Sequence, residues 1–141
     1  MEFVLGSDHG GFPLKEKIKK WLEGKGHSVK DLGCFSEERC DYPDYAKKVA
    51  GAVAKKKGAI GLLFCGTGIG MCIAANKVKG IRAALVHNEV TGRMAKEHNN
   101  ANILCLGGRT TSFANAKKEI GAFLKAEFQK GRHLRRIKKI A

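Results

Sequence analysis

The sequence predicts an α/β fold in which helices cover both faces of a parallel β-sheet. Short apolar segments alternate with amphipathic segments along the chain, and this alternation is typical of successive βαβ units. Segment 59–65 is an almost continuous apolar run, as expected of a strand that is covered on both faces. Pro13 and Pro43 stand near the starts of two amphipathic segments, where proline is common in helices. These observations indicate five strands and five helices.

The expected strands and helices follow one another in strict alternation. In the first helix, Leu14, Ile18 and Leu22 recur every four residues and so share one helical face. Thr111 or Ser112 can cap the last helix. The expected strands cover residues 2–7, 27–33, 59–65, 81–87 and 101–108, and the expected helices cover residues 13–24, 44–57, 69–80, 89–100 and 113–128.

The length and composition are those of a single globular domain. The chain has 141 residues, of which 43% are hydrophobic and 28% are charged, ordinary values for a domain with its own core. Its apolar runs are shorter than the ~20 residues that span a bilayer. Its first residues lack the basic segment and cleavage site of a signal peptide. We therefore expect a cytoplasmic protein with no membrane partner.

The cysteines argue against a disulfide scaffold and against a metal site. Their number, five, is odd, and no two of them form a C-x-x-C pair. The Cys and His residues also lack the paired spacing of zinc ligands, so no metal is expected. We interpret the cysteines as small buried hydrophobic residues, with the exception of Cys65.

A formal net charge of +14 predicts anionic partners, such as nucleic acids, membrane surfaces or phosphorylated metabolites. Most lysines are scattered over the predicted helices, as on solvated faces. The segment from Lys125 onward is more basic, with seven Lys or Arg against one acidic residue, Glu127. Aromatic residues make up only 7% of the chain and no nucleic-acid reader motif is present, so sequence-specific binding of nucleic acid is not expected.

Polar and glycine-rich segments follow four of the expected strands, at residues 8–11, 65–70, 87–88 and 107–109. The carboxyl ends of parallel strands share one edge of the sheet, and ligands of open α/β sheets bind there. We therefore expect these four segments to meet at one site.

The segment CGTGIG at residues 65–70 holds the strongest chemical signal. It is not a dinucleotide fingerprint, because its glycines are spaced G-x-G-x-G and no acidic residue lies between Cys65 and Glu89. It is not a P-loop either, because the Lys-Ser/Thr pair is missing. Backbone N–H groups of a glycine turn at a helix start can hold an anion. A plain strand-to-helix turn is the alternative interpretation.

Cys65 stands directly before this glycine turn. A helix N-terminus favours the thiolate form of a nearby cysteine, which suits a nucleophile or a general base. The alternative is a buried core cysteine. The position against the glycines favours the chemical role.

Three further groups of residues are candidates for the site. Asp8 and His9 suit acid–base chemistry or hydroxyl binding, although Asp8 can instead cap the following helix. His98 lies between the fourth helix and the fifth strand, at the opposite edge of the sheet, so a catalytic His98 serves the site of a neighbouring subunit. Arg132 and Arg136 are four residues apart and form a phosphate clamp on one face if the tail is helical.

The order and spacing of five motifs resemble the ribose-5-phosphate isomerase B family, which includes allose- and galactose-6-phosphate isomerases. The motifs are SDHGGFPLKEKI, DYPDYA, CGTGIGMCIAANK-x-x-GIRAA, HNNANIL and GRHLRRI, and they run from about residue 2 to residue 140. The resemblance implies one isomerase domain over residues 1–141, with a Rossmann-like three-layer α/β/α sandwich around a five-stranded parallel sheet. It also implies a homodimer, in some members paired into a tetramer, with shared active sites, to which a basic segment of about residues 130–141 contributes.

The resemblance further implies the reaction and its residues. The reaction is the interconversion of D-ribose 5-phosphate and D-ribulose 5-phosphate through a cis-enediol(ate), in the non-oxidative pentose phosphate pathway, with no metal or organic cofactor. Cys65 resembles the base, Thr67 a hydroxyl that holds the substrate, and His98 of the partner the acid–base that opens the sugar ring. The positions similar to substrate-binding residues are Asp8, His9, Tyr42, Gly66, Gly68, Ile69 and Gly70, and, as partner-chain residues, Asn99, Arg109, Arg132 and Arg136.

Other interpretations stay open at this point. Within the family, allose 6-phosphate or galactose 6-phosphate is the alternative substrate. Some members carry a glutamate base later in the loop, whereas here Met71 follows Gly70 and Cys65 is present, as in the cysteine type. Outside the family, a doubly wound nucleotide-binding domain and a basic nucleic-acid-binding protein are the rival hypotheses.

Overall fold

The computed structural model describes residues 1–140 and contains one five-stranded parallel sheet of strand order β2-β1-β3-β5-β4. The predicted α/β class and the five-stranded parallel sheet are confirmed. The strands are β1 (Glu2–Ser7), β2 (Ser28–Asp31), β3 (Ile60–Cys65), β4 (Ala83–Leu85) and β5 (Ile103–Gly107), and the helices are α1 (Phe12–Gly24), α2 (Tyr42–Lys55), α3 (Ile69–Ala75), α4 (Glu89–Glu97), α5 (Phe113–Lys125) and α6 (Arg132–Lys138). None of the helices within residues 1–140 is long and apolar enough to cross a membrane.

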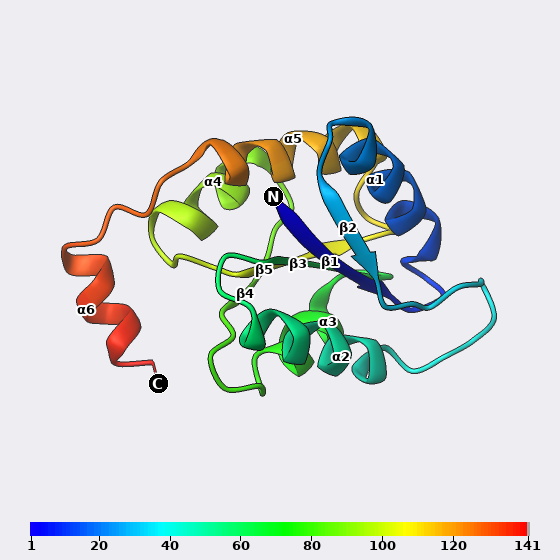
Figure 1. The fold of residues 1–141 in the computed structure, drawn as a ribbon, viewed down its shortest axis with the longest axis horizontal. Coiled ribbons are helices and arrows are strands. Elements are labelled where there is room, and N and C mark those ends of the chain that lie inside the picture. The colour runs from blue at the N-terminus through cyan, green and yellow to red at the C-terminus, as the bar shows by residue number, and fades with distance from the viewer. Residues whose placement is uncertain (141) are drawn as a thin grey trace.

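Helices form a layer on each face of the sheet (Figure 1). α1, α4 and α5 cover one face, and α2 and α3 cover the other. The strands are apolar on both faces because alternate residues point to opposite layers. On β3, for example, Leu62 and Phe64 belong to the core beneath α1, α4 and α5, whereas Leu63 and Cys65 belong to the core beneath α2 and α3.

Several elements end earlier than the sequence predicts. α3 stops at Ala75 because the Asn76 side chain donates to the carbonyl oxygens of Cys72 and Ala83 and accepts from the Ala83 N–H group. β4 has three residues rather than the expected seven. Its chain turns away at His87, whose N–H group donates to Thr91 Oγ1 at the start of α4. α4 and α5 each end three residues before the expected end, at residues 97 and 125.

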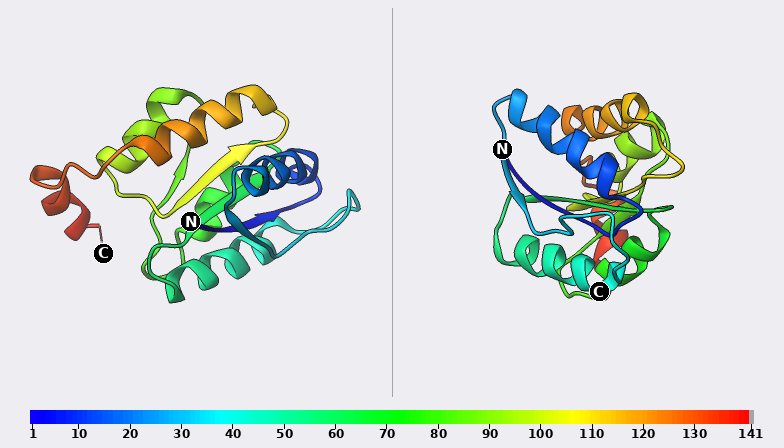
Figure 2. Two further views of the ribbon diagram at one scale, coloured as in Figure 1. Left: turned by 45° about the horizontal axis from the view of Figure 1, so that its top comes forward. Right: turned by 90° about the vertical axis from the view of Figure 1, so that its right-hand side faces the viewer.

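The basic C-terminal segment leaves the α/β layers and ends in a sixth helix. The connection from α5 is tied to α4 through Gln129, whose backbone N–H group donates to the Glu97 carbonyl oxygen at 3.0 Å. α6 then stands away from the sheet (Figure 2). The tail is thus helical, as the clamp of Arg132 and Arg136 requires. Ala141, the last residue of the expected segment, lies outside the described residues.

Glu119 on α5 is an acidic side chain buried away from water, where a negative charge is unfavourable. It is 1% exposed, and both carboxylate oxygens are buried without a hydrogen-bond partner. Burial raises the pKa of Glu119 above its usual value. The folded state therefore holds this proton more tightly than the unfolded chain does, so this group lowers stability as the pH rises above the unfolded pKa.

Replacing Glu119 with methionine should therefore stabilise the protein at neutral and higher pH. We expect a gain of about 1–3 kcal/mol at pH 8 that shrinks as the pH falls and vanishes below the ordinary pKa of Glu, about 4.3, where the carboxyl becomes protonated in the unfolded state too. Thermal unfolding of wild type and variant across this pH range measures the effect. Glu127→Met, at an exposed position of the chain after α5, is the control and should show no such pH-dependent gain. An unchanged or lower Tm of Glu119→Met at pH 8 would contradict the prediction.

Candidate active site

The ends of β1 and β3 bring two predicted site segments together. The strands are adjacent, and the Asp8 N–H group donates to the Phe64 carbonyl oxygen at 3.1 Å. β2 lies on one side of β1 and β3 on the other, so the strand order reverses at β1, and ligands of open α/β sheets bind at the carboxyl edge near such a point. β5 joins the same edge, where the Gly108 N–H group donates to the Cys65 carbonyl oxygen at 2.7 Å. The fourth expected segment, residues 87–88, instead starts α4, with Asn88 as its N-cap.

Cys65 is held by the backbone of the glycine loop. Its side chain is 5% exposed, and the Gly68 N–H group donates to the Cys65 Sγ atom at 3.0 Å. Gly68 is the N-cap of α3 and has a φ of 81°, a left-handed conformation that glycine adopts without strain. A side chain at this position would also meet Leu85, whose Cδ1 atom lies 2.8 Å from the place of a Cβ atom. The sulfur thus receives a backbone donor at a helix start, which stabilises negative charge on it.

The remaining loop residues form a small polar surface beside the sulfur. The Thr67 Oγ1 atom accepts from the Ile69 N–H group at 3.3 Å and is exposed. The first N–H groups of a helix have no partner within the helix, so those at the start of α3 can donate to a ligand. Tyr42, the first residue of α2, lies against Gly70, with its Cε1 atom 2.5 Å from where a Cβ atom would stand. Gly70 therefore leaves room for this ring.

Asp8 and His9 lie at the same edge with their orientations determined by backbone groups. The Asp8 Oδ1 atom accepts from the Gly11 N–H group at 3.0 Å. The N-cap of α1 is Gly11 itself, so Asp8 is not the cap of this helix. The Cys40 N–H group donates to the His9 Nδ1 atom at 3.3 Å. A neutral imidazole that accepts at Nδ1 carries its proton on Nε2, which makes the outer nitrogen of His9 a hydrogen-bond donor.

Arg109 lies with the glycine loop of its own chain. Its N–H group donates to the Gly66 carbonyl oxygen at 2.9 Å, and its guanidinium passes within 3.5 Å of the place of a Gly66 Cβ atom. The resemblance grouped Arg109 with Arg132 and Arg136 as residues of the partner chain. Within one chain Arg109 lies beside Gly66 because β5 ends at the same edge as β3 and the two strands are paired in register.

A second group of predicted site residues lies at the other edge of the sheet. His98 is the C-cap of α4, and a cavity of about 310 Å³ lies between it and α6. α6 lies beyond the starting ends of the strands, far from the tips of their arrows (Figure 2). Cys65 and His98 of one chain therefore lie at opposite edges of the sheet and do not share a site. The order of the elements predicted this separation. The residues that line the cavity are His98, Asn99, Arg132, His133, Arg136, Ile137 and Ile140.

His133 in this cavity was not predicted as a site residue. Its ring stacks on that of His98 at a centroid distance of 4.1 Å and an interplanar angle of 11°. It is 5% exposed, and its Nε2 atom is buried without a hydrogen-bond partner. Burial, helped by His98, Arg132 and Arg136, lowers the pKa of His133. The sequence signal was its place beside Arg132 in the GRH motif, but only the structure, which brings α6 next to the C-cap of α4, shows the stacked pair.

No three His, Cys, Asp or Glu side chains within residues 1–140 are grouped as a metal site requires, and all five cysteines are free thiols. The two groups described here can instead bind anions and move protons. One places a thiol beside backbone donors, and the other places two guanidiniums beside an imidazole.

The chain belongs to the ribose/galactose isomerase family, whose sequence model matches residues 3–140. It is 42% identical to ribose-5-phosphate isomerase B of Escherichia coli over 139 residues, which are 99% of this chain and 93% of that protein. The structure of ribose-5-phosphate isomerase B from Clostridium thermocellum is similar, with a TM-score of 0.97, 48% identity and coverage of 99% of this chain and 95% of that chain. The Mycoplasma genitalium enzyme, solved with bound ribulose-5-phosphate, has a TM-score of 0.94, 47% identity and coverage of 99% and 93%.

Proposed function

We propose that this protein interconverts D-ribose 5-phosphate and D-ribulose 5-phosphate through a cis-enediol(ate), as a step of the non-oxidative pentose phosphate pathway. The observation that carries the proposal is the Cys65 thiol, held by the Gly68 N–H group at the carboxyl edge of the sheet in a chain of this family. The relative with bound ribulose-5-phosphate supports the choice of a five-carbon sugar. Residues 1–141 form the isomerase domain in this proposal.

Cys65 is the base that moves a proton between C1 and C2 of the open-chain sugar. Removal of this proton places negative charge on the neighbouring oxygen. The N–H groups of residues 66–70 other than those of Gly68 and Ile69, which are bonded to Cys65 and Thr67, donate to it. Such donors stabilise the charge most where they are already oriented before the reaction. Thr67 holds a sugar hydroxyl beside the same loop. Proton transfer by a positioned side chain contributes about 10²–10⁴-fold to the rate.

Asp8, His9 and Tyr42 bind the sugar hydroxyls around this centre. His9 presents its Nε2–H group as a donor, because its Nδ1 atom is engaged by the Cys40 N–H group. Arg109 adds a positive charge at the same edge, beside Gly66. The reaction then needs two further elements, a group that opens the sugar ring and an anchor for the phosphate.

Those elements come from a second subunit in a homodimer. Two such dimers can pair into a tetramer. His98 of the partner opens the ring, and Asn99, Arg132 and Arg136 of the partner bind the phosphate and its neighbouring hydroxyls. Both edges of the sheet expose large apolar side chains that a partner can cover. Ile69 and Ile73 of α3 are 51% and 61% exposed beside the Cys65 loop, and Ile140 after α6 is 70% exposed.

The proposed reaction implies where in the cell the protein acts and which ligands it binds. Its substrates are metabolites of the cytoplasm, and five free thiols suit such a reducing compartment. No nucleic acid or membrane has a part in the reaction. The excess of positive charge instead draws phosphorylated sugars towards the site.

The substrate is tested by comparing kcat/KM for ribose 5-phosphate, allose 6-phosphate and galactose 6-phosphate on the purified protein. We expect the five-carbon sugar phosphate to be preferred by about tenfold or more, since one extra carbon in a fitted site costs that much. A higher kcat/KM for a six-carbon sugar phosphate would change the substrate and leave the reaction class. Absence of turnover with all three would contradict the proposed function.

Replacing Arg132 with alanine should mainly raise KM for the phosphorylated sugar. A hydrogen bond to a charged group contributes about 1.5–3 kcal/mol, so we expect KM to rise by about 10–100-fold and kcat to change less. Steady-state kinetics with ribose 5-phosphate measures both constants.

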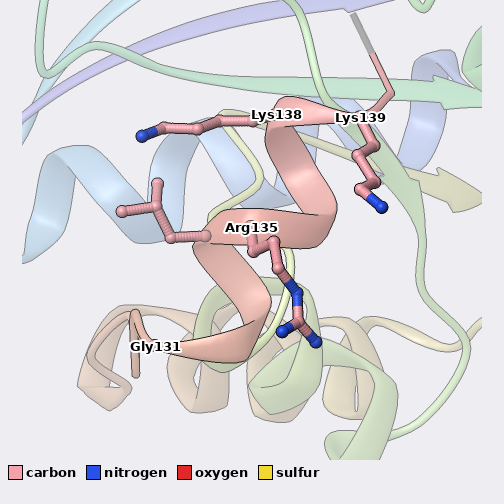
Figure 3. Close-up of a pocket in the computed structure, with 5 residues that line it drawn as sticks. Gly131, Arg135, Lys138 and Lys139 are labelled. Atoms are coloured by element: carbon pink, nitrogen blue, oxygen red, sulfur yellow. The ribbon is translucent and has the colours of Figure 1, made fainter.

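Arg135→Ala is the matched control for this variant. Arg135 is on the same helix but lines a different cavity, together with Gly131, Leu134, Lys138 and Lys139 (Figure 3). Its loss removes the same charge from the protein and should leave KM within about twofold of wild type, because surface substitutions away from a site have small effects. Equal effects of the two variants would show that net charge, and not a phosphate clamp, is responsible.

A further inference from the structure

The turn between α4 and β5 carries two residues of the proposed shared site, His98 and Asn99. His98 is the C-cap of α4, and Asn100, two residues later, has a φ of 43°. This is the left-handed region, which residues other than glycine adopt uncommonly and asparagine more readily than most. The direction in which His98 and Asn99 point therefore depends on what holds this turn.

The Arg82 side chain, directly before β4, binds the backbone of the turn. Its Nε atom donates to the carbonyl oxygens of Asn99 at 3.0 Å and Asn100 at 3.2 Å, and its Nη2 atom donates to the Asn100 carbonyl oxygen at 2.8 Å. A guanidinium suits this arrangement because its donors form a rigid planar fork, and hydrogen bonds from a charged donor are stronger than neutral ones. One side chain thus ties two consecutive carbonyl groups directly after His98.

The backbone of Arg82 is itself fixed to the far end of the same turn. The Arg82 N–H group donates to the Asn102 Oδ1 atom at 2.9 Å, and the Asn102 N–H group donates to the Arg82 carbonyl oxygen at 3.0 Å. The Asn102 amide also donates to the Gly80 carbonyl oxygen at 2.9 Å. The guanidinium therefore starts from a fixed point at the edge of the sheet.

Arg82 differs in this respect from the proposed phosphate clamp of Arg132 and Arg136. Two of its three guanidinium nitrogens donate to carbonyl oxygens of its own chain. Arg132 and Arg136 instead line the cavity beside His98, where a phosphate can meet their donors. The charged donors of Arg82 thus act on the protein backbone rather than on a ligand.

We propose that Arg82 is a positioning residue for the ring-opening step, an inference that rests on the proposed function. By holding the carbonyl oxygens of Asn99 and Asn100, Arg82 fixes the direction in which His98 and Asn99 reach the site of the partner subunit. Misplacement of a reacting group by about 1 Å can cost about 10²-fold in rate. Loss of Arg82 should therefore impair His98 without removing any group that touches the substrate.

Replacing Arg82 with methionine removes the donors and keeps a side chain of similar length. We expect kcat/KM for ribose 5-phosphate to fall by about 10–100-fold, and Arg82→Lys, which retains one charged donor, to lie between this variant and wild type. Lys79→Met is the matched control, because it removes a positive charge from an exposed side chain three residues away. Its kcat/KM should stay within about twofold of wild type.

Heterodimers assign the effect to one half of the shared site. Arg82 holds the segment that carries His98 of its own chain, so the defect should follow His98 and not Cys65. A heterodimer of Arg82→Met with Cys65→Ala has one site that combines an intact Cys65 with an undisturbed His98, and it should recover about half of the wild-type activity. With His98→Gln no site is intact, so activity should not exceed that of the Arg82→Met homodimer.

Amide hydrogen exchange without substrate tests the same contact independently of turnover. In Arg82→Met, the Asn100 and Ala101 N–H groups, which donate to the carbonyl oxygens of Lys96 and Ala95, should exchange about tenfold faster or more, because the turn has lost charge-assisted hydrogen bonds. In Lys79→Met their exchange should match wild type.

Four results would overturn the proposal: wild-type kcat/KM in Arg82→Met, equal recovery with both partner variants, recovery with neither, or unchanged amide exchange in the turn. Unchanged exchange together with a lower kcat/KM would show that Arg82 binds the substrate itself. If the wild-type protein did not turn over ribose 5-phosphate, the proposed function would fall, and amide exchange would still decide whether Arg82 holds the turn.

Discussion

Replacing Cys65 with alanine is expected to lower kcat/KM for ribose 5-phosphate by at least about 10²–10⁴-fold, the usual contribution of a proton-transfer group. The Cys65 Sγ atom accepts a hydrogen bond from the Gly68 N–H group at the start of α3. An alanine side chain has no group that can take the C2 proton. Cys65→Ser, which keeps nearly the same volume, should be similarly impaired because a hydroxyl is a much weaker base. An assay of ribulose 5-phosphate formation measures the loss.

Loss of activity must be separated from loss of structure. Circular dichroism and Tm should show that Cys65→Ala stays folded, because the change removes only one atom from a strand packed on both faces. Cys72→Ser is the matched control, since it replaces a thiol seven residues away on α3 that the reaction does not use. Its kcat/KM should stay within a few-fold of wild type. Near-wild-type turnover by Cys65→Ala would show that another group is the base.

The second large effect is expected when two inactive variants are combined. Cys65→Ala and His98→Gln should each have little activity as homodimers, because every shared site then lacks one of its two proton-transfer groups. In a heterodimer of the two variants, one site carries both substitutions and the other carries none. A heterodimer isolated through two different tags should therefore recover about half of the wild-type activity, as the two-fold symmetry of a shared interface requires.

This experiment decides where the site lies. In the structure of one chain, Cys65 is the last residue of β3, at its carboxyl end, whereas His98 lies before β5 at the other edge of the same sheet. Recovery of activity is possible only if the two residues of one site come from different chains. A heterodimer no more active than the separate variants would place the complete site within one chain and contradict the shared arrangement.

Most of the fold and half of the site could be predicted from local sequence patterns. The alternation of apolar and amphipathic segments identified every strand and the five helices of the α/β layers. The positions of Asp8 and Cys65 after their strands predicted that they would meet, because parallel strands end at one edge. The same logic placed His98 at the opposite edge. These features depend on periodicity and on chain order, both of which can be read along the sequence.

The remaining features depend on contacts between segments that are far apart in the chain. The end of α3 is determined by Asn76 bonding to Ala83 of β4, and the stacking of His133 on His98 by the position of α6 next to the C-cap of α4. The position of Arg109 beside Gly66 likewise needs the register of β5 on β3.

The sequence by itself therefore determined the kinds of element, their order and the edge at which the glycine loop lies. The tertiary structure decided which groups meet there, including the Gly68 N–H group on Cys65 and the Arg109 guanidinium beside Gly66. The physical reason is that periodicity and turn chemistry act over a few residues, so they can be recognised in short segments of the sequence. Side-chain neighbours across strands and helices are set by close packing of the whole core, which no local pattern contains.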